Sequence, residues 1–355
     1  MKYFVGPIML LLLLNGLGTG KSNRKLGVTL SVIYHAFILS LLIFRGYCLT
    51  QAFSVGKILI WMGKIFSLTL WWLVHARMEK ISSLIGQPCI LKSSKDIRDN
   101  ERILQISRIA VATVIIVTFI IPAGRTLRFF ILSNAAQSCF PNFLSDYKQL
   151  RIGIHFIYEF ADMHVSSTLM YAISIFYTQY CFSFSQCLKD AHLPVDQVRK
   201  LYRKSFQVFA EFEDVLSVLV FILFTVFFCK FFLMIFVFTY SFKYNEAFFI
   251  TPYILYFISY LLAAIAIVLS ADDIQNILNK FHRIEYIISN NSGKPKLFSA
   301  LNSRHVGKCV DPEQLVLTGW GMFVVHKPLL LSMATWLFTY AAIIIQYYYT
   351  PPEWD

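Results

Sequence analysis

Long runs of apolar residues, separated by shorter polar segments, extend along most of the chain. A transmembrane helix needs about 20 mainly apolar residues, and windows of about 19 residues identify segments of that kind. Seven segments qualify, at residues 26–44, 58–76, 103–123, 155–182, 215–240, 247–270 and 320–347. Lys64, Lys230 and the sequence His326-Lys327-Pro328 interrupt three of them. The pattern predicts an all-α membrane protein with seven transmembrane helices.

The composition agrees with a membrane protein and disfavours a soluble enzyme. Apolar residues make up 57% of the chain and charged residues 15%, whereas an average soluble domain has roughly 45–50% and 25%. Lys and Arg exceed Asp and Glu by 12 charges. In a soluble protein this surplus would indicate a nucleic-acid partner, but here we assign the basic residues to loops and predict no nucleic-acid partner.

The placement of the basic residues predicts an orientation. Assigned to alternate sides of the seven segments, about three times as many Lys and Arg residues lie on the side of the N-terminus as on the opposite side, which predicts a cytoplasmic N-terminus and an extracellular C-terminus. Residues 1–20 resemble a signal peptide, but this count leads us to treat residues 1–25 as a cytoplasmic or interfacial segment. G-protein-coupled receptors have the reverse orientation, and neither an Asp-Arg-Tyr-like triplet after the third segment nor an Asn-Pro dipeptide occurs.

Helical periodicity continues on the cytoplasmic side of the fifth and sixth segments. Apolar residues recur every three or four positions at Val198, Leu201, Tyr202, Phe206 and Phe209. They recur again at Ile274, Ile277, Leu278, Phe281, Ile284 and Ile288, up to the breaker at 289–293. We therefore expect cytoplasmic helical extensions. Their apolar stripes fit packing within the chain or contacts between subunits, and the periodicity does not distinguish these alternatives.

The sequence shows no motif for enzymatic or metal chemistry. The seven Cys residues form no CxxC or Cys/His pattern, the eight His residues form no His-Glu-x-x-His motif, and no Gly-rich phosphate loop is present. We expect no catalytic residues, no metal site and no cofactor. The sequence leaves open whether Cys48 and Cys139 pair. A transporter is a weaker alternative, because we find no internal repeat.

The last segment concentrates its polar residues on one helical face. At about 100° per residue, Ser332, Thr335, Thr339, Ile343 and Gln346 share one side, whereas Leu330 and Leu337 lie on the other. In hydrocarbon such a face lies against an aqueous path or against a neighbouring helix. Gln346 favours an ion path, because its amide could coordinate partly hydrated ions. One helix cannot enclose a pore, so this interpretation requires several subunits.

The same region resembles the C-terminal signature of insect gustatory receptors. The resemblance rests on Gly-Trp-Gly-Met-Phe at 319–323, Pro-Leu-Leu-Leu-Ser at 328–332 and Thr-Tyr-Ala-Ala-Ile-Ile-Ile-Gln-Tyr at 339–347. It differs from the family at Tyr347, which replaces Phe, and at Ala341, where the sugar-receptor branch has Glu. The resemblance therefore implies a receptor for bitter or contact chemicals. A metabotropic G-protein-coupled chemoreceptor remains the alternative.

The resemblance to this family also implies a mechanism and partners. It implies a ligand-gated, non-selective cation channel in the plasma membrane of chemosensory neurons, formed as a tetramer with identical or related gustatory receptor subunits in contact with membrane lipid. Gln346 and Ile343 would form the outer gate of the pore, Thr339 would lie below them, and Tyr340 and Tyr347 would pack or couple. The expected organisation is an N-terminal segment 1–25, a ligand-sensing domain 26–270, a cytoplasmic anchor 271–319 and a pore helix with a short extracellular tail 320–355.

In that family a small tastant enters from outside into a cavity among the earlier helices. The predicted topology places one set of residues at the outer ends of those helices: Trp61, Lys64, Thr118, Phe119, Tyr158, Glu159, Asp162, Tyr240, Tyr253 and Tyr256. Glu159 and Asp162 are three residues apart on one helical face, and Lys64 is a candidate partner for them. The aromatic residues also fit an interfacial belt or core packing, and the acidic pair also fits simple solvation.

Overall fold

The computed structural model describes residues 55–86, 167–189, 195–243, 251–291 and 316–349, together with isolated positions within 29–43, 105–126 and 153–156. The continuous ranges contain five helices and one hairpin. The elements are α3 (Val55–Gly86), α7 (Leu169–Lys189), α8 (Val195–Lys243), α9 (Thr251–Asn291), β1 (Thr318–Gly319), β2 (Phe323–Val324) and α11 (Lys327–Tyr349). The described part of the chain is thus almost entirely helical, as the sequence predicts.

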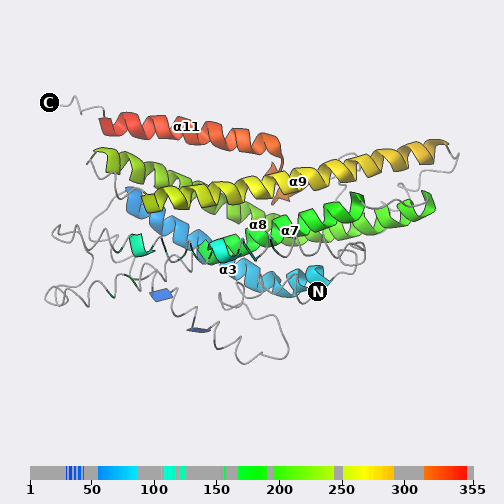
Figure 1. Ribbon diagram of the computed structural model, residues 1–355, viewed down its shortest axis with the longest axis horizontal. Helices are drawn as coiled ribbons and strands as arrows, with labels where there is room; N and C mark the ends of the chain where they lie inside the picture. Colours follow the sequence, from blue (N-terminus) through cyan, green and yellow to red (C-terminus); the bar gives the residue numbers. More distant parts are fainter. Residues whose placement is uncertain are drawn as a thin grey trace.

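The helices α8 and α9 are much longer than a bilayer requires. α8 has 49 residues and α9 has 41, which at about 1.5 Å per residue gives about 70 Å and about 60 Å. A hydrocarbon core is only about 30 Å thick. Figure 1 shows both helices running along the long axis of the molecule. The helical extensions expected before residue 215 and after residue 270 are therefore confirmed as continuous parts of these helices.

Three helices in the described part of the chain are long and apolar enough to cross a membrane, over Phe206–Thr239, Ile254–Lys280 and Lys327–Gln346. They correspond to the fifth, sixth and seventh predicted segments. α3 covers the second segment and continues about ten residues past its predicted end, and α7 covers the second half of the fourth. The first and third segments are described only at scattered positions and short runs, so the count of seven stays a prediction.

The predicted start of the last segment at residue 320 is wrong. Residues 318–324 form an antiparallel hairpin in which Thr318 pairs with Val324 and Gly319 with Phe323. Trp320 and Gly321 have φ angles of 52° and 70° in its turn, a left-handed conformation that a right-handed helix cannot contain. α11 starts at Lys327, and Pro328 fits its first turn because the missing N–H has no helical acceptor there.

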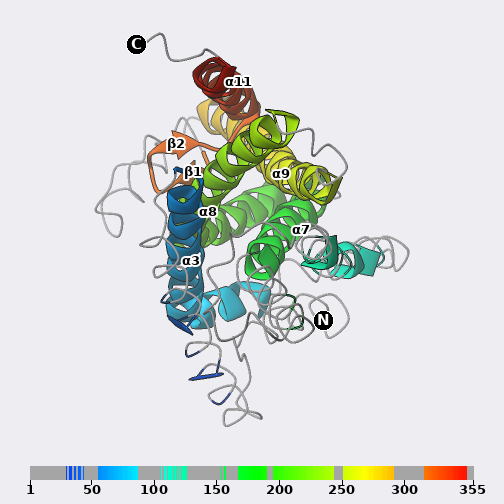
Figure 2. The same ribbon diagram turned by 90° about the vertical axis from the view of Figure 1, so that its left-hand side faces the viewer.

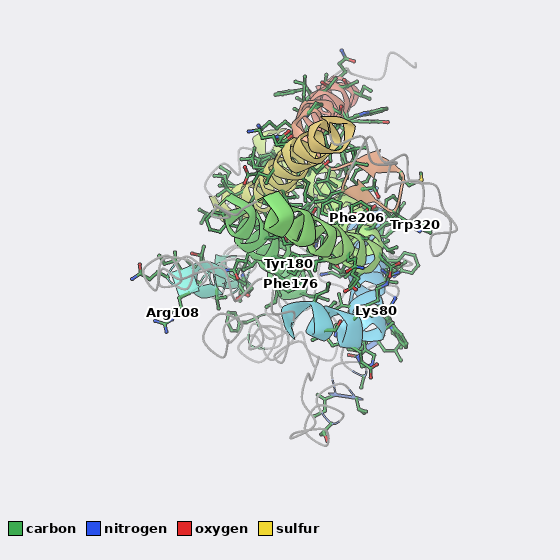
Figure 3. The ribbon with its side chains drawn as sticks, turned by 90° about the vertical axis from the view of Figure 1, so that its right-hand side faces the viewer. Lys80, Arg108, Phe176, Tyr180, Phe206 and Trp320 are labelled. Carbon is green, nitrogen blue, oxygen red and sulfur yellow. The ribbon has the colours of Figure 1, made fainter. Side chains whose placement is uncertain are left out.

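Aromatic side chains fill the core between the helices. α3 packs along α8, and α7 packs along α9 (Figure 2). The largest fully buried side chains are Trp71, Tyr177, Tyr256, Tyr260, Phe212, Phe224, Phe227 and Phe231. Tyr180 of α7 stacks on Phe212 of α8 at 4.3 Å between ring centroids, and Phe176 lies 6.1 Å from Tyr180 (Figure 3).

The described residues of the apolar stripes on the helical extensions pack within the chain itself. Phe209 on α8 and Ile274, Ile277 and Leu278 on α9 are all buried in the core, and Phe206 is half-buried against it. These residues therefore do not require a second subunit to cover them. The side chains of Val198, Leu201, Tyr202, Phe281, Ile284 and Ile288 lie outside the described part of the structure.

Candidate pore helix and ligand region

The helix α11 packs on the rest of the described chain through one face only. Met333 is buried, and Leu329, Leu330 and Leu337 pack against the core formed with α8 and α9. In its most apolar stretch only 6% of the residues are buried, against 56% for α8. Figure 2 shows α11 at the edge of the bundle, beyond α8 and α9. Within the described part of the chain, most of this apolar helix is therefore left uncovered.

The predicted polar face of α11 lies on the uncovered side. Ser332, Thr335, Thr339 and Gln346 are exposed, and Ile343 is 51% exposed. The three hydroxyl groups donate hydrogen bonds to carbonyl oxygens four residues earlier, at 3.2, 3.0 and 2.9 Å for Ser332, Thr335 and Thr339. These bonds satisfy each hydroxyl proton inside the helix and leave the oxygen lone pairs available. Such a face is compatible both with an aqueous path and with a neighbouring helix.

An apolar groove runs beside the polar face, between α8 and α11. Its volume is about 500 Å³, and it is lined by Phe228, Phe232, Trp336, Tyr340 and Ile344. Tyr340 lies 5.1 Å from Phe232, nearly perpendicular to it, and 5.8 Å from Trp336, nearly parallel to it. Tyr340 thus contacts α8 beside the polar face. Tyr347 belongs to α11, but its side chain is outside the described part of the structure.

The hairpin before α11 is attached to α8 by two side chains. The carboxylate of Glu213 accepts a hydrogen bond from the backbone N–H of Thr318, at 2.9 Å, and a second from its hydroxyl group. The backbone N–H of Trp320 donates to both the carbonyl and the hydroxyl oxygen of Ser217, at 3.1 and 2.8 Å. These bonds fix the chain that leads into α11.

α9 holds the other end of this connection. The Gln275 side chain donates a hydrogen bond of 2.7 Å to the carbonyl of Val325. Asp272 forms a salt bridge of 2.9 Å with Lys327, the first residue of α11. The first turn of α11 is therefore positioned by both α8 and α9.

Buried polar side chains gather near the N-terminal ends of α7 and α9. The hydroxyl of Ser167 lies 2.9 Å from the hydroxyls of both Tyr256 and Tyr260, which also bond to each other. One turn along, the hydroxyls of Tyr171 and Ser259 are 2.5 Å apart. This hydroxyl cluster ties α7 to α9 in the interior of the bundle.

Two lysines are buried in the same bundle. Lys64 on α3 and Lys230 on α8 are each 6% exposed. The Lys230 ammonium lies 5.8 Å from the centroid of the Tyr256 ring, at the upper limit of a cation–π contact. A Cβ at Gly63 would lie 3.7 Å from Cε of Lys230, so the side chain of Lys230 runs against α3. Figure 1 shows the N-terminal ends of α3 and α9 at the same end of the molecule as the C-terminal end of α11.

The structure places only part of the predicted ligand set. Tyr256, Lys64 and Thr118 are buried, and Trp61 is half-buried. The side chains of Tyr240 and Tyr253, on α8 and α9, are not described. Phe119, Tyr158, Glu159 and Asp162 lie outside the described residues, so the pairing of Lys64 with the two acids stays a prediction.

Sequence reasoning missed several of these contacts. In the sequence Lys230 is visible only as an interruption of an apolar segment, although a charge in such a segment must lie against polar or aromatic partners. Tyr256 and Tyr260 are four residues apart and thus share a helical face. Ser167, two residues before α7, and Tyr171 on α7 are also four residues apart, which again indicates a shared helical face. The attachment of Glu213 to Thr318 joins positions more than a hundred residues apart and has no local signal.

Comparison with known proteins gives a likeness of fold. No protein-family model and no curated protein sequence matches the chain. Among solved structures, it is similar to the insect olfactory receptor OR5 from Machilis hrabei, with a TM-score of 0.65 and 15% sequence identity, covering 98% of this chain and 100% of that one. The same receptor in complex with eugenol gives a TM-score of 0.68 and 13% identity over 98% and 100% of the two chains. The chain therefore has the fold of an insect olfactory receptor.

Proposed function

We propose that the protein is a chemosensory receptor subunit that acts as a ligand-gated, non-selective cation channel. The observation that carries this proposal is the placement of the polar face of α11. Ser332, Thr335 and Thr339 are exposed, whereas Leu330 and Leu337 on the other side pack on the core. A helix that turns its polar face away from its own chain is suited to line an aqueous path shared with other subunits.

The fold supports this proposal over a soluble or enzymatic role. The similar solved structures are those of an insect olfactory receptor, and one of them is a complex with eugenol. By analogy, the occupant of the ligand region is a small organic molecule. The same proposal includes the seven predicted transmembrane segments, the cytoplasmic N-terminus and the location in a neuronal plasma membrane. It also includes the division of the chain into regions that end at residues 25, 270 and 319.

Within this proposal Gln346 and Ile343 form the outer gate, and Thr339, Thr335 and Ser332 line the path below it in each of four subunits. Tyr340 couples the pore helix to α8, and Tyr347 belongs to the same motif. The resemblance of residues 339–347 to gustatory receptors, together with Ala341, supports a bitter or contact-chemical ligand. Lys64, Trp61, Thr118 and Tyr256 belong to the ligand region, with Phe119, Tyr158, Glu159, Asp162, Tyr240 and Tyr253.

Patch recording in cells that express the chain tests the proposal. We expect a panel of bitter and contact tastants to evoke cation currents, and we expect Gln346→Ala to alter relative permeability or rectification. Gln207→Ala, which removes an exposed amide from α8 outside the predicted pore, is the matched control and should leave permeation unchanged. Unchanged permeation in a responsive Gln346→Ala channel would remove this pore assignment.

Epitope labelling in intact cells separates the channel from the metabotropic alternative. We expect an N-terminal epitope to be reached only after permeabilisation and a C-terminal epitope to be reached in intact cells. An N-terminus accessible from outside would favour a G-protein-coupled receptor, which has that orientation.

A further inference from the structure

One turn of α8, residues 213–217, contacts both α3 and the hairpin that precedes α11. On one side it binds α3. Arg77 donates hydrogen bonds of 2.6 and 2.7 Å to the backbone carbonyls of Asp214 and Val215, and the Lys80 ammonium lies 3.1 Å from the Asp214 carboxylate. Two short bonds from a guanidinium to the backbone fix the position of the helix itself.

On its other side the same turn holds the hairpin. Glu213 and Ser217 are four residues apart and therefore lie on one face of α8. Glu213 binds Thr318, and Ser217 binds Trp320. Figure 3 shows Lys80 and Trp320 on the same side of the molecule. Movement of this turn would thus move α3 and the hairpin together.

The hairpin holds a strained backbone conformation. Trp320 has a φ of 52°, which is unfavourable for a bulky residue. Its N–H is bonded to Ser217, and its ring packs 5.5 Å from Phe221, one turn further along α8. At Gly319 an added Cβ would overlap the Phe323 ring, so the hairpin is tightly closed. A strained conformation held from outside is typical of a switch region.

We infer that the 213–217 turn of α8 is the joint through which movement of α3 reaches the pore helix. This inference rests on the proposed function. α3 carries Trp61 and Lys64 in the ligand region, and Arg77 lies 13 residues after Lys64, about 20 Å along the same helix. A shift of α3 displaces the turn through Arg77. The turn then pulls on Thr318 and Trp320, and the hairpin moves the start of α11.

A double-mutant cycle between the two sides of the joint tests this coupling. The variants are Arg77→Gln, Thr318→Val and the double substitution, and the readout is the half-maximal concentration of an agonist found in the tastant panel. We expect each single variant to shift that concentration by about five-fold or more, with single-channel conductance unchanged. The double variant should shift it clearly less than the product of the single shifts, because both substitutions break one pathway.

Control variants separate this role from a structural one. Thr318→Ser keeps the hydroxyl and should retain the wild-type concentration dependence, whereas Glu213→Ala, which removes the acceptor of both Thr318 hydrogen bonds, should resemble Thr318→Val. Glu79→Gln removes an exposed charge from α3 two residues after Arg77, on a different side of that helix, and Thr225→Val removes a hydroxyl bonded within α8. Neither control should shift the response. Surface labelling of each variant measures whether folding and delivery are retained.

Hydrogen exchange on the purified full chain provides a readout independent of current. We expect Arg77→Gln to accelerate exchange of the Thr318 and Trp320 amides by about five-fold or more, and Glu79→Gln to leave it unchanged. If the wild-type chain gives no agonist-evoked current but Arg77→Gln still accelerates exchange of the hairpin amides, the proposed function is contradicted and the joint is retained. Unchanged hairpin exchange in Arg77→Gln, or single shifts that simply multiply in the double variant, would overturn the joint.

Discussion

Leu337 and Thr339 are two residues apart on α11 and lie in different surroundings. Leu337 packs against the core that α11 shares with α8 and α9, and Thr339 is exposed on the side away from it. Residues two positions apart in a helix differ by about 200° in direction. The boundary between the covered and uncovered sides of α11 therefore runs between these two residues, and the function proposed for the helix depends on it.

The hairpin before α11 should be sensitive to small added volume. Gly319→Ala places a Cβ inside the Phe323 ring, so we expect a loss of about 1–3 kcal/mol in the free energy of unfolding. Thermal unfolding of the detergent-purified protein measures this loss. Gly319→Ala combined with Phe323→Leu should recover part of the stability, since the smaller side chain makes room. A Gly319→Ala protein as stable as the wild type would contradict the packing described for the hairpin.

Substitution at Gly321 is limited by the backbone conformation, whereas substitution at Gly319 is limited by overlap with a side chain. A Cβ at Gly321 meets no atom, but the φ of 70° disfavours any residue with a side chain. We expect Gly321→Ala to cost about 1 kcal/mol, and this cost should not change when Phe323 is replaced by Leu. The comparison of both alanine variants with and without Phe323→Leu separates steric overlap from backbone strain.

The hydroxyl cluster between α7 and α9 should stabilise the fold only as a complete unit. Ser167→Ala leaves the hydroxyls of Tyr256 and Tyr260 without one shared partner, so we expect a loss of about 1–3 kcal/mol of unfolding free energy. Replacing Ser167 by Ala and both tyrosines by Phe removes these three mutually bonded hydroxyls together and should recover most of that loss. Equal destabilisation by the single and triple variants would show that hydrogen bonding is not the cause.

The contact between α3 and Lys230 gives a graded test of the ligand region. An alanine Cβ at Gly63 would lie 3.7 Å from Cε of Lys230, an ordinary contact, so we expect Gly63→Ala to leave the agonist response close to wild type. Gly63→Leu is too large for that space and should displace Lys230 from its position beside Tyr256. We expect a shift of at least about five-fold in the half-maximal agonist concentration. Equal responses of both variants would exclude a role for this contact in ligand sensing.

The regular parts of the fold follow from the sequence because they depend on local periodicity. The extension of α8 through Phe206 and Phe209, and that of α9 through Ile274 and Leu278, were predictable from apolar spacing. The start of α11 was not, because a long apolar stretch hides the turn at Trp320. The two glycines around Trp320 were the available signal, because glycine is unfavourable inside a helix.

Contacts between distant parts of the chain were less accessible to sequence reasoning. Lys230 and Gly63 are brought together by the packing of α3 on α8, and Glu213 reaches Thr318 only once α8 and the hairpin are in place. The polar face of α11 was predictable from helical geometry, but its exposure depends on which face packs on α8 and α9. That choice follows from the shape of the whole bundle.

Cysteine accessibility at positions 337 and 339 tests the central claim about α11 most directly. We expect a positively charged methanethiosulfonate reagent to block the agonist-evoked current of Thr339→Cys, because the proposed function places this exposed position on the aqueous path. Leu337→Cys, packed on the core, should be unaffected under the same conditions, as should the wild-type channel with its own cysteines. Block of Leu337→Cys with no effect on Thr339→Cys would place the opposite face of the helix in the pore and contradict the account.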